Sequence, residues 1–546
     1  MDTPRPSPAE GLKSGSNHLR GPIAEELLND STSFSKPAVG LLKFHGVYQQ
    51  DDRDLRKTSP SKVYSSMVRV GVPGGRLTAG QYLHLDTLAD RAGDGTLRIT
   101  SRQGVQYHYV GKRDLKAHIA AINSVGLGTW AACGDVVRNV TASPEPVEGR
   151  PDLTQTVRLV ARELKPKSRA YIEIWMDGEK AASLDEPETE SLYGETYLPR
   201  KFKICFVHAG DNTVDVYAND LGFVAHANGD QVEAFTVLAG GGMGQSNGVK
   251  ESHPRLADVV CDIEPNEVLE VAKAVVSIHR DFGNRSNRRL ARLKYVIQDR
   301  GIDWFRQELA SRLGRPLTPA RPLTWTRGDD YLGWHRSAPG EWFFGLRVIS
   351  GRIKDALRPA IRAVVEEFRP EIRFTVQQNM LFCGIPEARK ADFDAALRRN
   401  GIVTGDALPP VLRHSMSCPA LPTCGQAITE SERTLPEIAD QVQSLFNGAN
   451  LSTLPVRLRT TGCPNGCARP YTAEIGVVGE SVNLYTLYLG GSETGERLAR
   501  PWRKLVPVAD IAATLEPLVS RFAAERSPTE SFGRSEEHTS ELQSRQ

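Results

Sequence analysis

The chain repeats part of its own sequence, and this duplication limits the folds that it can adopt. LRITSRQGVQYHYV from Leu97 resembles IRFTVQQNMLFCGI from Ile372, because both place Arg, Thr and Gln at the same intervals on a strand-like alternation. Two further pairs occur in the same order, FTVLAGGGMG with YTLYLGGSETG and LPRKFK with LPVRLR. Three pairs in one order predict two copies of a unit that consists of a small front module and a larger module.

Strand-like and helix-like segments are mixed along both copies without a strict βαβ rhythm. EVLEVAKAVVSIHRDFG and IRAVVEEFR carry apolar residues at helical spacing, and TPARPLTWTRGDDYLG is a proline-rich stretch suited to join the two copies. These patterns predict an α+β fold with pseudo-twofold symmetry between the copies. The expected domains are residues 1–145, 146–320, 321–408 and 409–532.

The last residues do not resemble the rest of the chain. GRSEEHTSELQSRQ, residues 533–546, is polar and aperiodic, and RSEEHTSELQS looks like the translation of a sequencing adapter joined to a truncated reading frame. We therefore predict that this tail is non-native and leave it out of the fold prediction.

The composition indicates a soluble globular protein of several domains. The chain has 546 residues, of which 40% are hydrophobic and 25% are charged, and its formal net charge is +2. This near balance gives no reason to expect binding to nucleic acid or to a membrane surface. The N-terminal stretch has no apolar core typical of a signal peptide, and no run has the length of a transmembrane helix, so we expect a cytoplasmic protein.

Four of the eight cysteines form two close pairs. Five residues separate Cys418 from Cys424, and three separate Cys463 from Cys467. Clustered cysteines in a reducing compartment more often bind metal or do chemistry than form disulfides. Zinc usually selects tighter C-x2-C pairs, whereas the four irons of a [4Fe–4S] cluster accept wider and uneven spacing. From the spacing alone, the cluster, a zinc site and buried structural cysteines all stay open as interpretations.

The cysteine motifs CPALPTC and TGCPNGCARP closely resemble the cluster motif of the sulfite and nitrite reductase hemoproteins. Similar stretches follow nearly the whole chain, among them LLKFHGVYQQDDRD, MVRVGVPGGRLT, CGDVVRNV, YGETYLPRKFK and RDFGNRSNRRLARLKY. Members of this family are internally duplicated and hold siroheme next to a [4Fe–4S] cluster. The resemblance implies both cofactors, two ferredoxin-like half-modules, two larger α/β modules that bind siroheme and the cluster, and an electron donor that is either ferredoxin or an NADPH-dependent flavoprotein subunit.

The same resemblance implies roles for individual residues. Cys467 would bridge the cluster to the siroheme iron, and the other irons would bind Cys418, Cys424 and Cys463. The residues expected to face the substrate are Arg69, Arg138, Lys201 and Lys203. Siroheme carries many carboxylates and needs cationic partners, because unpaired buried charge is costly. The residues expected to bind it are Arg98, Arg102, Gln103, Asn284, Arg285, Arg288 and Cys467.

Spacing adds two expectations about the cofactor-binding residues. Arg98 and Arg102 are four residues apart, which would put both on one face of a strand. Arg285 and Arg288 belong to GNRSNRRLARLK, which we expect to lead into a helix. For Arg289 in the same stretch, simple solvation is the more ordinary explanation.

Lys201 and Lys203 flank Phe202, so a strand would place both ammonium groups on one face. Arginine suits bidentate binding of oxyanion oxygens, and lysine is a compact proton donor whose pKa falls among other cations. Related nitrite reductases tend to carry Asn in place of Lys203. The resemblance therefore implies an assimilatory sulfite reductase hemoprotein, which reduces the small oxyanion sulfite to sulfide with six electrons, and leaves ferredoxin-nitrite reductase as the alternative.

Further interpretations stay open beside this one. The cysteines could hold zinc while the basic strands bind an anion such as RNA, or the chain could be a catalytically inactive homologue. Cys133 departs from the pattern of enteric members, and we hypothesise either a small buried residue or a covalent link to Tyr48. GGGMG ends an apolar strand and recurs as GGSETG, so a structural or siroheme-facing turn is expected there rather than a dinucleotide site.

Overall fold

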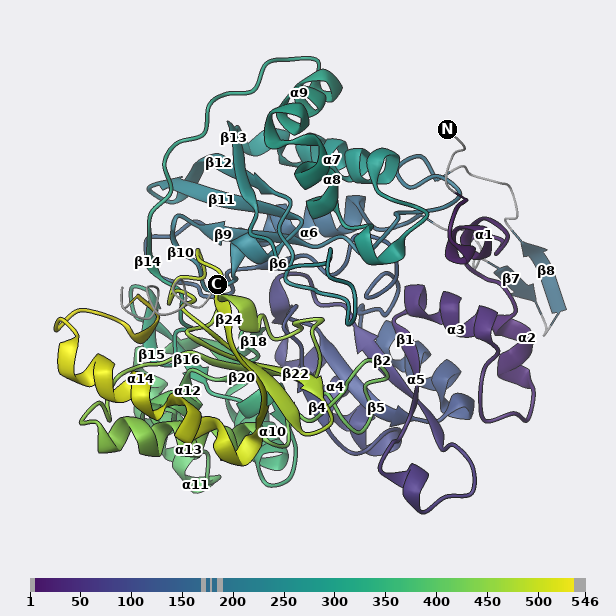
Figure 1. Cartoon of the computed structure of the whole chain (residues 1–546). Coiled ribbons are helices and arrows are strands. Elements are labelled where there is room, and N and C mark those ends of the chain that lie inside the picture. Colours follow the sequence, from purple (N-terminus) through teal and green to yellow (C-terminus); the bar gives the residue numbers. More distant parts are fainter. Residues whose placement is uncertain (1–4, 168–172, 177–178, 184–189, 535–546) are drawn as a thin grey trace.

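The computed structural model describes residues 5–167, 173–176, 179–183 and 190–534 (Figure 1). Helices and strands alternate irregularly along the chain, so the predicted α+β class is confirmed. Within the described residues, four five-stranded sheets form the body of the molecule. Most of the tail predicted to be non-native lies outside the described residues. Its first residue, Gly533, belongs to the fold, because its N–H donates a hydrogen bond to Oε1 of Glu474 at 2.9 Å.

The first small module follows three N-terminal helices, α1 (Pro8–Ser14), α2 (Ile23–Leu28) and α3 (Lys36–Leu42). Its sheet contains, in spatial order, β1 (Val47–Asp51), β2 (Tyr64–Val70), β5 (Val105–Val110), β4 (Leu97–Ile99) and β17 (Arg352–Ile353). Its helices are α4 (Ala79–Arg91) and α5 (Leu115–Asn123). Helix α4 begins at a capping box, in which the Thr78 side chain accepts from the N–H of Gln81 and the Gln81 side chain accepts from the N–H of Thr78.

The second small module repeats this arrangement. Its sheet contains β15 (Gly333–Ala338), β16 (Glu341–Leu346), β19 (Met380–Pro386), β18 (Glu371–Phe374) and β3 (Arg76–Leu77). Its helices are α10 (Leu357–Phe368) and α11 (Lys390–Arg399). The predicted duplication into two half-modules is therefore present in the order of the strands.

The two small modules exchange edge strands. Strand β3 belongs to the first copy in sequence but pairs with β18 of the second, and β17 of the second copy pairs with β4 of the first. Gly75 precedes β3 with φ of 75°, and Gly351 precedes β17 with φ of 68°. A side chain at either glycine would collide with a backbone carbonyl of the sheet that receives the strand. The exchange joins the two modules through main-chain hydrogen bonds.

The two larger modules share one strand pattern, with two parallel pairings followed by two antiparallel ones. The first sheet contains β6 (Thr141–Ala142), β9 (Ile204–His208), β11 (Leu221–Asn228), β12 (Gln231–Ala239) and β13 (Asp258–Ile263). The second contains β20 (Met416–Ser417), β21 (Leu458–Thr461), β22 (Ile475–Ser481), β23 (Leu484–Leu489) and β24 (Arg500–Pro507). The predicted pseudo-twofold symmetry extends to these modules.

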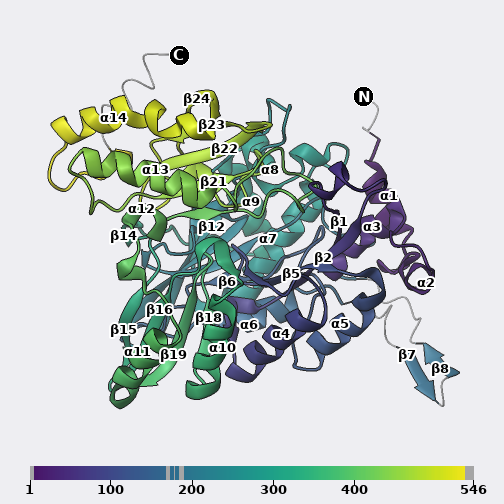
Figure 2. The ribbon, with the colours of Figure 1, turned by 90° about the horizontal axis from the view of Figure 1, so that it is seen from below.

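Helices accompany both larger sheets. In the first copy they are α6 (Thr154–Glu163), α7 (Val268–Phe282), α8 (Leu293–Arg300) and α9 (Ile302–Leu313). In the second copy α13 (Leu435–Gly448) and α14 (Ile511–Glu525) lie beside the sheet, as Figure 2 shows. A hairpin of β7 (Glu173–Met176) and β8 (Glu179–Ser183) and the strand pair β10 (Gly210–Asp211) and β14 (Trp325–Arg327) complete the strands named here. The predicted linker contains β14.

The register of the larger sheets corrects one of the three sequence pairs. The N–H of Leu221 donates to the carbonyl of Lys203 at 3.1 Å, and the N–H of Ile475 donates to the carbonyl of Arg457 at the same distance. Since these bonds occupy equivalent places in the two sheets, Lys203 corresponds to Arg457. LPRKFK and LPVRLR, placed letter over letter, would instead match Lys203 with Arg459. The two strands are related as predicted, but the sequence match is wrong by two residues.

Apolar side chains pack into one large core and several smaller ones. The largest cluster runs from Leu19 to Ile402 and includes both small modules and much of the first larger module. A separate cluster from Val411 to Phe532 fills the second larger module. The predicted domain boundaries stay a prediction. In the part of the chain that the structure describes, no helix combines the length and the apolarity that crossing a membrane requires.

Candidate active site

The turn of residues 133–138 lies beside the segment 198–203, and main-chain hydrogen bonds fix the two together. Phe202 donates to the carbonyl of Val136 at 3.0 Å, and Arg138 donates to the carbonyl of Phe202 at 2.9 Å. This pairing continues into the parallel contact of β6 with β9. It brings Arg138 next to Lys201 and Lys203, as the resemblance implied.

Lys201 and Lys203 carry side-chain amines that have no partner among the residues described by the structure. Phe202 between them is fully buried, and both lysines are half-buried, which agrees with the predicted alternation. Among the residues that the structure describes, neither ammonium makes a hydrogen bond or an ion pair. Burial lowers the pKa of Lys201 to about 7 and that of Lys203 well below its usual value, and neighbouring arginines such as Arg292 add to both effects.

The nearest carboxylate in this segment is already engaged. Oδ2 of Asp220 accepts the backbone N–H of Lys203 at 2.8 Å, and the same carboxylate holds the guanidinium of Arg292 at 2.7 Å. Asp220 lies in NDLGFVA, one of the family-like stretches, but its sequence context alone gave it no role. It fixes the main chain of Lys203 and leaves the ammonium available for another anion.

Arg69 on β2 reaches the same region. Its Nη1 donates to Sγ of Cys133 at 2.8 Å, and its guanidinium lies 5.8 Å from the ring centre of Tyr48. Tyr48 and Cys133 are themselves hydrogen-bonded neighbours, and burial is the main cause that raises the pKa of Tyr48 to about 12. The proposed covalent link between these two side chains stays a prediction. Peptide mass spectrometry in which Cys133 is fully alkylated would rule it out.

The four paired cysteines lie in two loops at the ends of β20 and β21. The N–H of Gly462 donates to Sγ of Cys418 at 3.4 Å, and Nδ2 of Asn465 donates to Sγ of Cys463 at 3.6 Å. Donors directed at sulfur stabilise a thiolate ligand and tune a cluster that it binds. Cys467, in contrast, is exposed. Its sulfur is therefore accessible to a bound group.

The spacing of these cysteines separates a cluster from a zinc site. No three His, Cys, Asp or Glu side chains of the described residues lie close enough together to hold a single metal ion. A tetrahedral zinc site with Zn–S bonds of about 2.3 Å would require its sulfurs within roughly 4 Å of one another. Each thiolate of a [4Fe–4S] cluster binds a different iron, so its sulfurs lie farther apart. The four cysteines fit a cluster better than zinc.

Electrostatics link the cysteines to the cations. Burial is the main cause that raises the pKa of Cys418, and the charge of a Cys467 thiolate is the next. The same Cys467 charge opposes the lowering of the pKa of Lys201 and Lys203. A single thiolate thus acts on the cysteine loops and on the two lysines. The sulfur-rich and the cationic groups form one site.

The glycine-rich turn of the first copy packs on the second cysteine loop. The N–H of Gln245 donates to the carbonyl of Pro464 at 2.9 Å. Nζ of Lys294 donates to the carbonyls of Gly242 at 3.1 Å and Gly244 at 2.9 Å. Two carbonyls of the turn are therefore held by a buried lysine, and the residue after the turn is hydrogen-bonded to the second cysteine loop. The expectation of a structural or siroheme-facing turn rather than a dinucleotide site stays a prediction.

The strand argument for Arg98 and Arg102 is wrong. Arg98 lies on β4, but Arg102 and Gln103 lie in the turn that follows, where Gln103 has φ of 56°. Arg98 pairs with Glu432 at 3.1 Å, and Nη1 of Arg102 donates to Oδ1 of Asn219 at 2.9 Å. The side chain of Gln103 is occupied by three main-chain bonds, to Ala142 and Phe374. Of these three residues, only the guanidinium of Arg102 is charged and without a carboxylate partner in the described part of the chain.

The basic stretch around residue 288 leads into helix α8, as expected, and the helix begins at Leu293. Asn284 and Arg285 lie in the turn before it, and Arg288 lies in a short 3-10 helix, Arg288–Leu290. Arg285 pairs with Glu10 of α1, and Arg288 pairs with Asp135 at 2.7 Å. The side chain of Asn284 accepts hydrogen bonds from the main chain of its own turn. These residues anchor the N-terminal helix and the 133–138 turn. Arg289 is exposed, as the solvation explanation expects.

Within the described residues, the second copy has no equivalent group of free cations. Arg457, the counterpart of Lys203, pairs with Asp329 of the linker at 2.7 Å. The strand pairings make Gly345 the counterpart of Arg69, and a side chain at Gly345 would collide with the main chain of the linker. The linker thus occupies the place in the second copy that is equivalent to the place of the Arg69 and Lys203 side chains in the first. Only the first copy keeps an open cationic site among the described residues.

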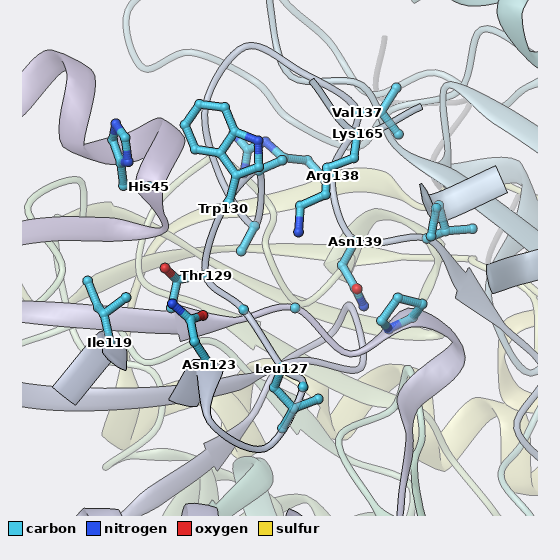
Figure 3. Close-up of a pocket in the computed structure, with 18 residues that line it drawn as sticks. His45, Ile119, Asn123, Leu127, Thr129, Trp130, Val137, Arg138, Asn139 and Lys165 are labelled. Atoms are coloured by element: carbon cyan, nitrogen blue, oxygen red, sulfur yellow. The ribbon is translucent and has the colours of Figure 1, made fainter. Parts of the chain in front are cut away.

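A separate pocket of about 600 Å³ lies behind the 133–138 turn (Figure 3). Arg138, Trp130 and Lys165 line it together with Ile119 and Asn123 of α5. None of the four paired cysteines and neither Lys201 nor Lys203 is among its lining residues. It shares Arg138 with the candidate active site, but the cysteine loops lie elsewhere. The paired cysteines and the free cations, rather than this pocket, remain the candidate active site, because within the described residues the pocket lining includes neither the four cysteines nor the two lysines.

The duplicated α+β fold brings two pairs of cysteines close to lysines that have no ion-pair partner in the described residues. Residues 157–317 match the family described as "Nitrite and sulphite reductase 4Fe-4S domain", and residues 60–125 and 335–400 each match "Nitrite/Sulfite reductase ferredoxin-like half domain". The first match covers the first larger module, whereas the paired cysteines lie in its second copy, at residues 418–467.

Full-length relatives extend the match along the chain. The sulfite reductase (NADPH) hemoprotein beta-component of Myxococcus xanthus is 44% identical over 547 residues, which cover 97% of this chain and 96% of that protein. The sulfite reductase (ferredoxin) of Synechococcus elongatus is 42% identical and covers 96% of this chain and 88% of its own length. The solved NirA protein of Mycobacterium tuberculosis superposes with a TM-score of 0.78 and 25% identity, over 97% of this chain and 96% of that one. The chain belongs to the nitrite and sulfite reductase family, in the group of the sulfite reductase hemoproteins, and it is an oxidoreductase.

Proposed function

We propose that this chain is an assimilatory sulfite reductase hemoprotein that reduces sulfite to sulfide at a siroheme coupled to a [4Fe–4S] cluster. The main observation that supports sulfite as the substrate is the pair of ammonium groups of Lys201 and Lys203, unpartnered within the described residues and close to the exposed Cys467. The names of the relatives above, which are sulfite reductases, support the same choice.

The cofactor ligands follow from the donor set. Cys418, Cys424, Cys463 and Cys467 would hold the cluster, and Cys467, the exposed one, would also meet the siroheme iron. When bound, the two groups supply electrons one at a time to a substrate that needs several. Arg102, which has no carboxylate partner in the described residues, is the strongest candidate among the proposed siroheme-binding residues. Arg98, Arg285 and Arg288 are already paired with protein carboxylates, so their part is to position the site.

The cationic side chains would bind the substrate and supply its protons. Arg69 and Arg138 present guanidinium groups suited to the oxygens of a small oxyanion. Lys201 and Lys203 hold protons at amines whose pKa values are lowered, which makes transfer to a departing oxygen easier near neutral pH. Asp220 holds the main chain of Lys203 in place and keeps its own charge on Arg292. Asp220 therefore does not neutralise the ammonium of Lys203, which stays available to bind an anionic substrate.

Nitrite is the second candidate substrate. The matched family descriptions name nitrite as well as sulfite reductases, and nitrite is also a small oxyanion whose reduction needs electrons and protons together. Lys203 favours sulfite, because nitrite reductases of this type tend to carry Asn there. An absorption spectrum with iron and acid-labile sulfide analysis tests the cofactors, with about five irons per chain expected, four in the cluster and one in the heme. Turnover of sulfite and nitrite by the same preparation then tests the substrate, and a colourless protein or a preference for nitrite would overturn the corresponding part of the proposal.

A further inference from the structure

The loop that carries Cys424 reaches the surface beside the β1–β2 connection. Cys424 is half-buried, and the next two residues, Gly425 and Gln426, are exposed. The guanidinium of Arg53 donates to the carbonyl of Cys424 and to the carbonyl of Ala427, both at 2.7 Å. The segment from Arg53 onward is therefore joined by hydrogen bonds to a residue proposed to bind the cluster.

Exposed apolar side chains gather on the segments around this loop. Seven large apolar side chains are more than a third exposed in the part of the chain that the structure describes. Three of them, Leu55, Val63 and Val482, belong to segments that adjoin the Cys424 loop. The carbonyl of Val63 accepts from Asp52, and the residue after Val482 donates its N–H to Oγ1 of Thr429 at 3.1 Å. We call residues 53–63, 424–433 and 480–485 the Cys424 rim.

The charges of the Cys424 rim leave an excess of cations. Arg56 pairs with Asp51, and Arg433 pairs with both Asp54 and Glu430. Lys57 and Lys62 are exposed, and neither makes an ion pair within the described residues. Glu480 of the rim also makes no ion pair within the described residues, so the unpaired charge of Lys57, Lys62 and Glu480 is net positive. It shares the rim with the exposed apolar side chains of Leu55, Val63 and Val482.

We propose that the Cys424 rim is the docking surface for a one-electron carrier protein with an acidic face around its redox group. The inference rests on the proposed function, since it takes Cys424 as a cluster ligand. Weak electron-transfer complexes use small interfaces, and complementary charge guides their association. Leu55, Val63 and Val482 supply the apolar centre, and Lys57 and Lys62 attract the acidic partner. A carrier bound here lies against the loop of Cys424 and needs no other route to the cluster.

The test uses the holoenzyme with two kinds of reductant. The carriers are a reduced plant-type ferredoxin and a reduced flavodoxin, both acidic, and the small reductant is the methyl viologen radical. The variant is Lys57→Glu with Lys62→Glu, and the matched control is Lys250→Glu with Lys273→Glu, two lysines that are also exposed but lie outside the rim. A further variant, Leu55→Ser with Val482→Ser, tests the apolar centre.

For the Lys57/Lys62 variant we expect the KM for at least one carrier to rise on the order of tenfold and its dependence on salt to weaken. Activity with methyl viologen and the cofactor content should stay unchanged, and the control should behave as the wild type does. An unchanged KM for both carriers, or an equal loss with viologen, would overturn the docking surface. So would a wild-type enzyme that accepts viologen but neither carrier. A wild type that fails with viologen as well would contradict the proposed function instead.

Discussion

Lys203 and Arg457 occupy equivalent positions in the two copies, yet only one of them has a carboxylate for its side chain. The backbone N–H of Lys203 donates to Asp220 at 2.8 Å, and that of Arg457 donates to Glu474 at 2.9 Å. The guanidinium of Arg457 then pairs with Asp329, whereas the ammonium of Lys203 has no partner among the described residues. The two copies therefore hold these residues in the same main-chain arrangement. They differ in the pairing of the side chain, and only Lys203 keeps a side chain that is available to an external anion.

The free ammonium of Lys203 predicts a difference between substrates. We expect Lys203→Asn to lower kcat/KM for sulfite by about 10²-fold, the loss typical of a missing proton donor, and to lower that for nitrite less. Steady-state assays with methyl viologen measure both values on one preparation. Equal losses for the two substrates would contradict the role of Lys203 in selecting sulfite.

The lowered pKa of Lys201, about 7, predicts a fall in activity on the alkaline side. The protonated amine is needed as a cation and as a donor, and it loses its proton as pH rises through this pKa. A bound anion can only raise the pKa, so the fall is expected at or above pH 7. Arginine stays charged in this range. For Lys201→Arg we therefore expect a KM for sulfite that does not change with pH in this range, together with a lower kcat. If the KM of the variant still rose at alkaline pH as it does in the wild type, the titration would belong to another group.

The exposed position of Cys467 predicts that its replacement uncouples the two proposed cofactors. We expect Cys467→Ser to lose electronic coupling between heme and cluster, seen by absorption and electron paramagnetic resonance spectra, together with sulfite reduction. Cys205→Ser is the control, because that cysteine is buried on β9, outside both cysteine loops. A Cys467→Ser protein with unchanged spectra would contradict the assignment.

Asp215 predicts a large effect on stability. Its carboxylate is buried and pairs with Arg459 at 2.9 Å and with Arg469, and these arginines outweigh burial to lower its pKa to about 2. Removing one partner of a buried pair leaves the other charge uncompensated, so we expect Asp215→Ala to cost about 3–5 kcal/mol. Asp54→Ala breaks the exposed pair with Arg433 and should cost less than about 1 kcal/mol. Unfolding midpoints compare the two, and equal shifts would contradict the argument.

Glu145 predicts a dependence of stability on pH. It is 3% exposed, and no other residue in the described part of the chain donates a hydrogen bond to its carboxylate oxygens. Burial is the main cause that raises its pKa well above the usual value, and the charges of Asp211 and Asp330 add to it, against Arg150. A raised carboxyl pKa means that its contribution to stability is complete at low pH and is lost as pH rises towards the folded-state pKa. Glu145→Gln should match the wild-type melting temperature near about pH 4, where the carboxyl is largely protonated in both states, and should exceed it increasingly as pH rises. Parallel curves from about pH 4 to pH 9 would show that Glu145 does not titrate there.

The duplication and the α+β class could be predicted because short segments of the two copies still show the same alternation of residues along a strand. The correspondence between LPRKFK and LPVRLR could not be predicted correctly. It depends on hydrogen bonds to Leu221 and Ile475, which lie on neighbouring strands later in the chain. The sequence of the cysteine pairs and of Lys201 and Lys203 was enough to mark a site. It could not show that Arg98 is paired with Glu432, a partner more than three hundred residues away.

The exchange of β3 and β17 bears on how the chain is made. The first small sheet receives its edge strand only after residue 353 has left the ribosome, so a nascent chain that ends earlier presents the open edge of β4 to solvent or to a chaperone. The second sheet, by contrast, finds its edge strand, residues 76–77, already synthesised. The sheet of the first small module can therefore be completed only after the second small module has been partly synthesised.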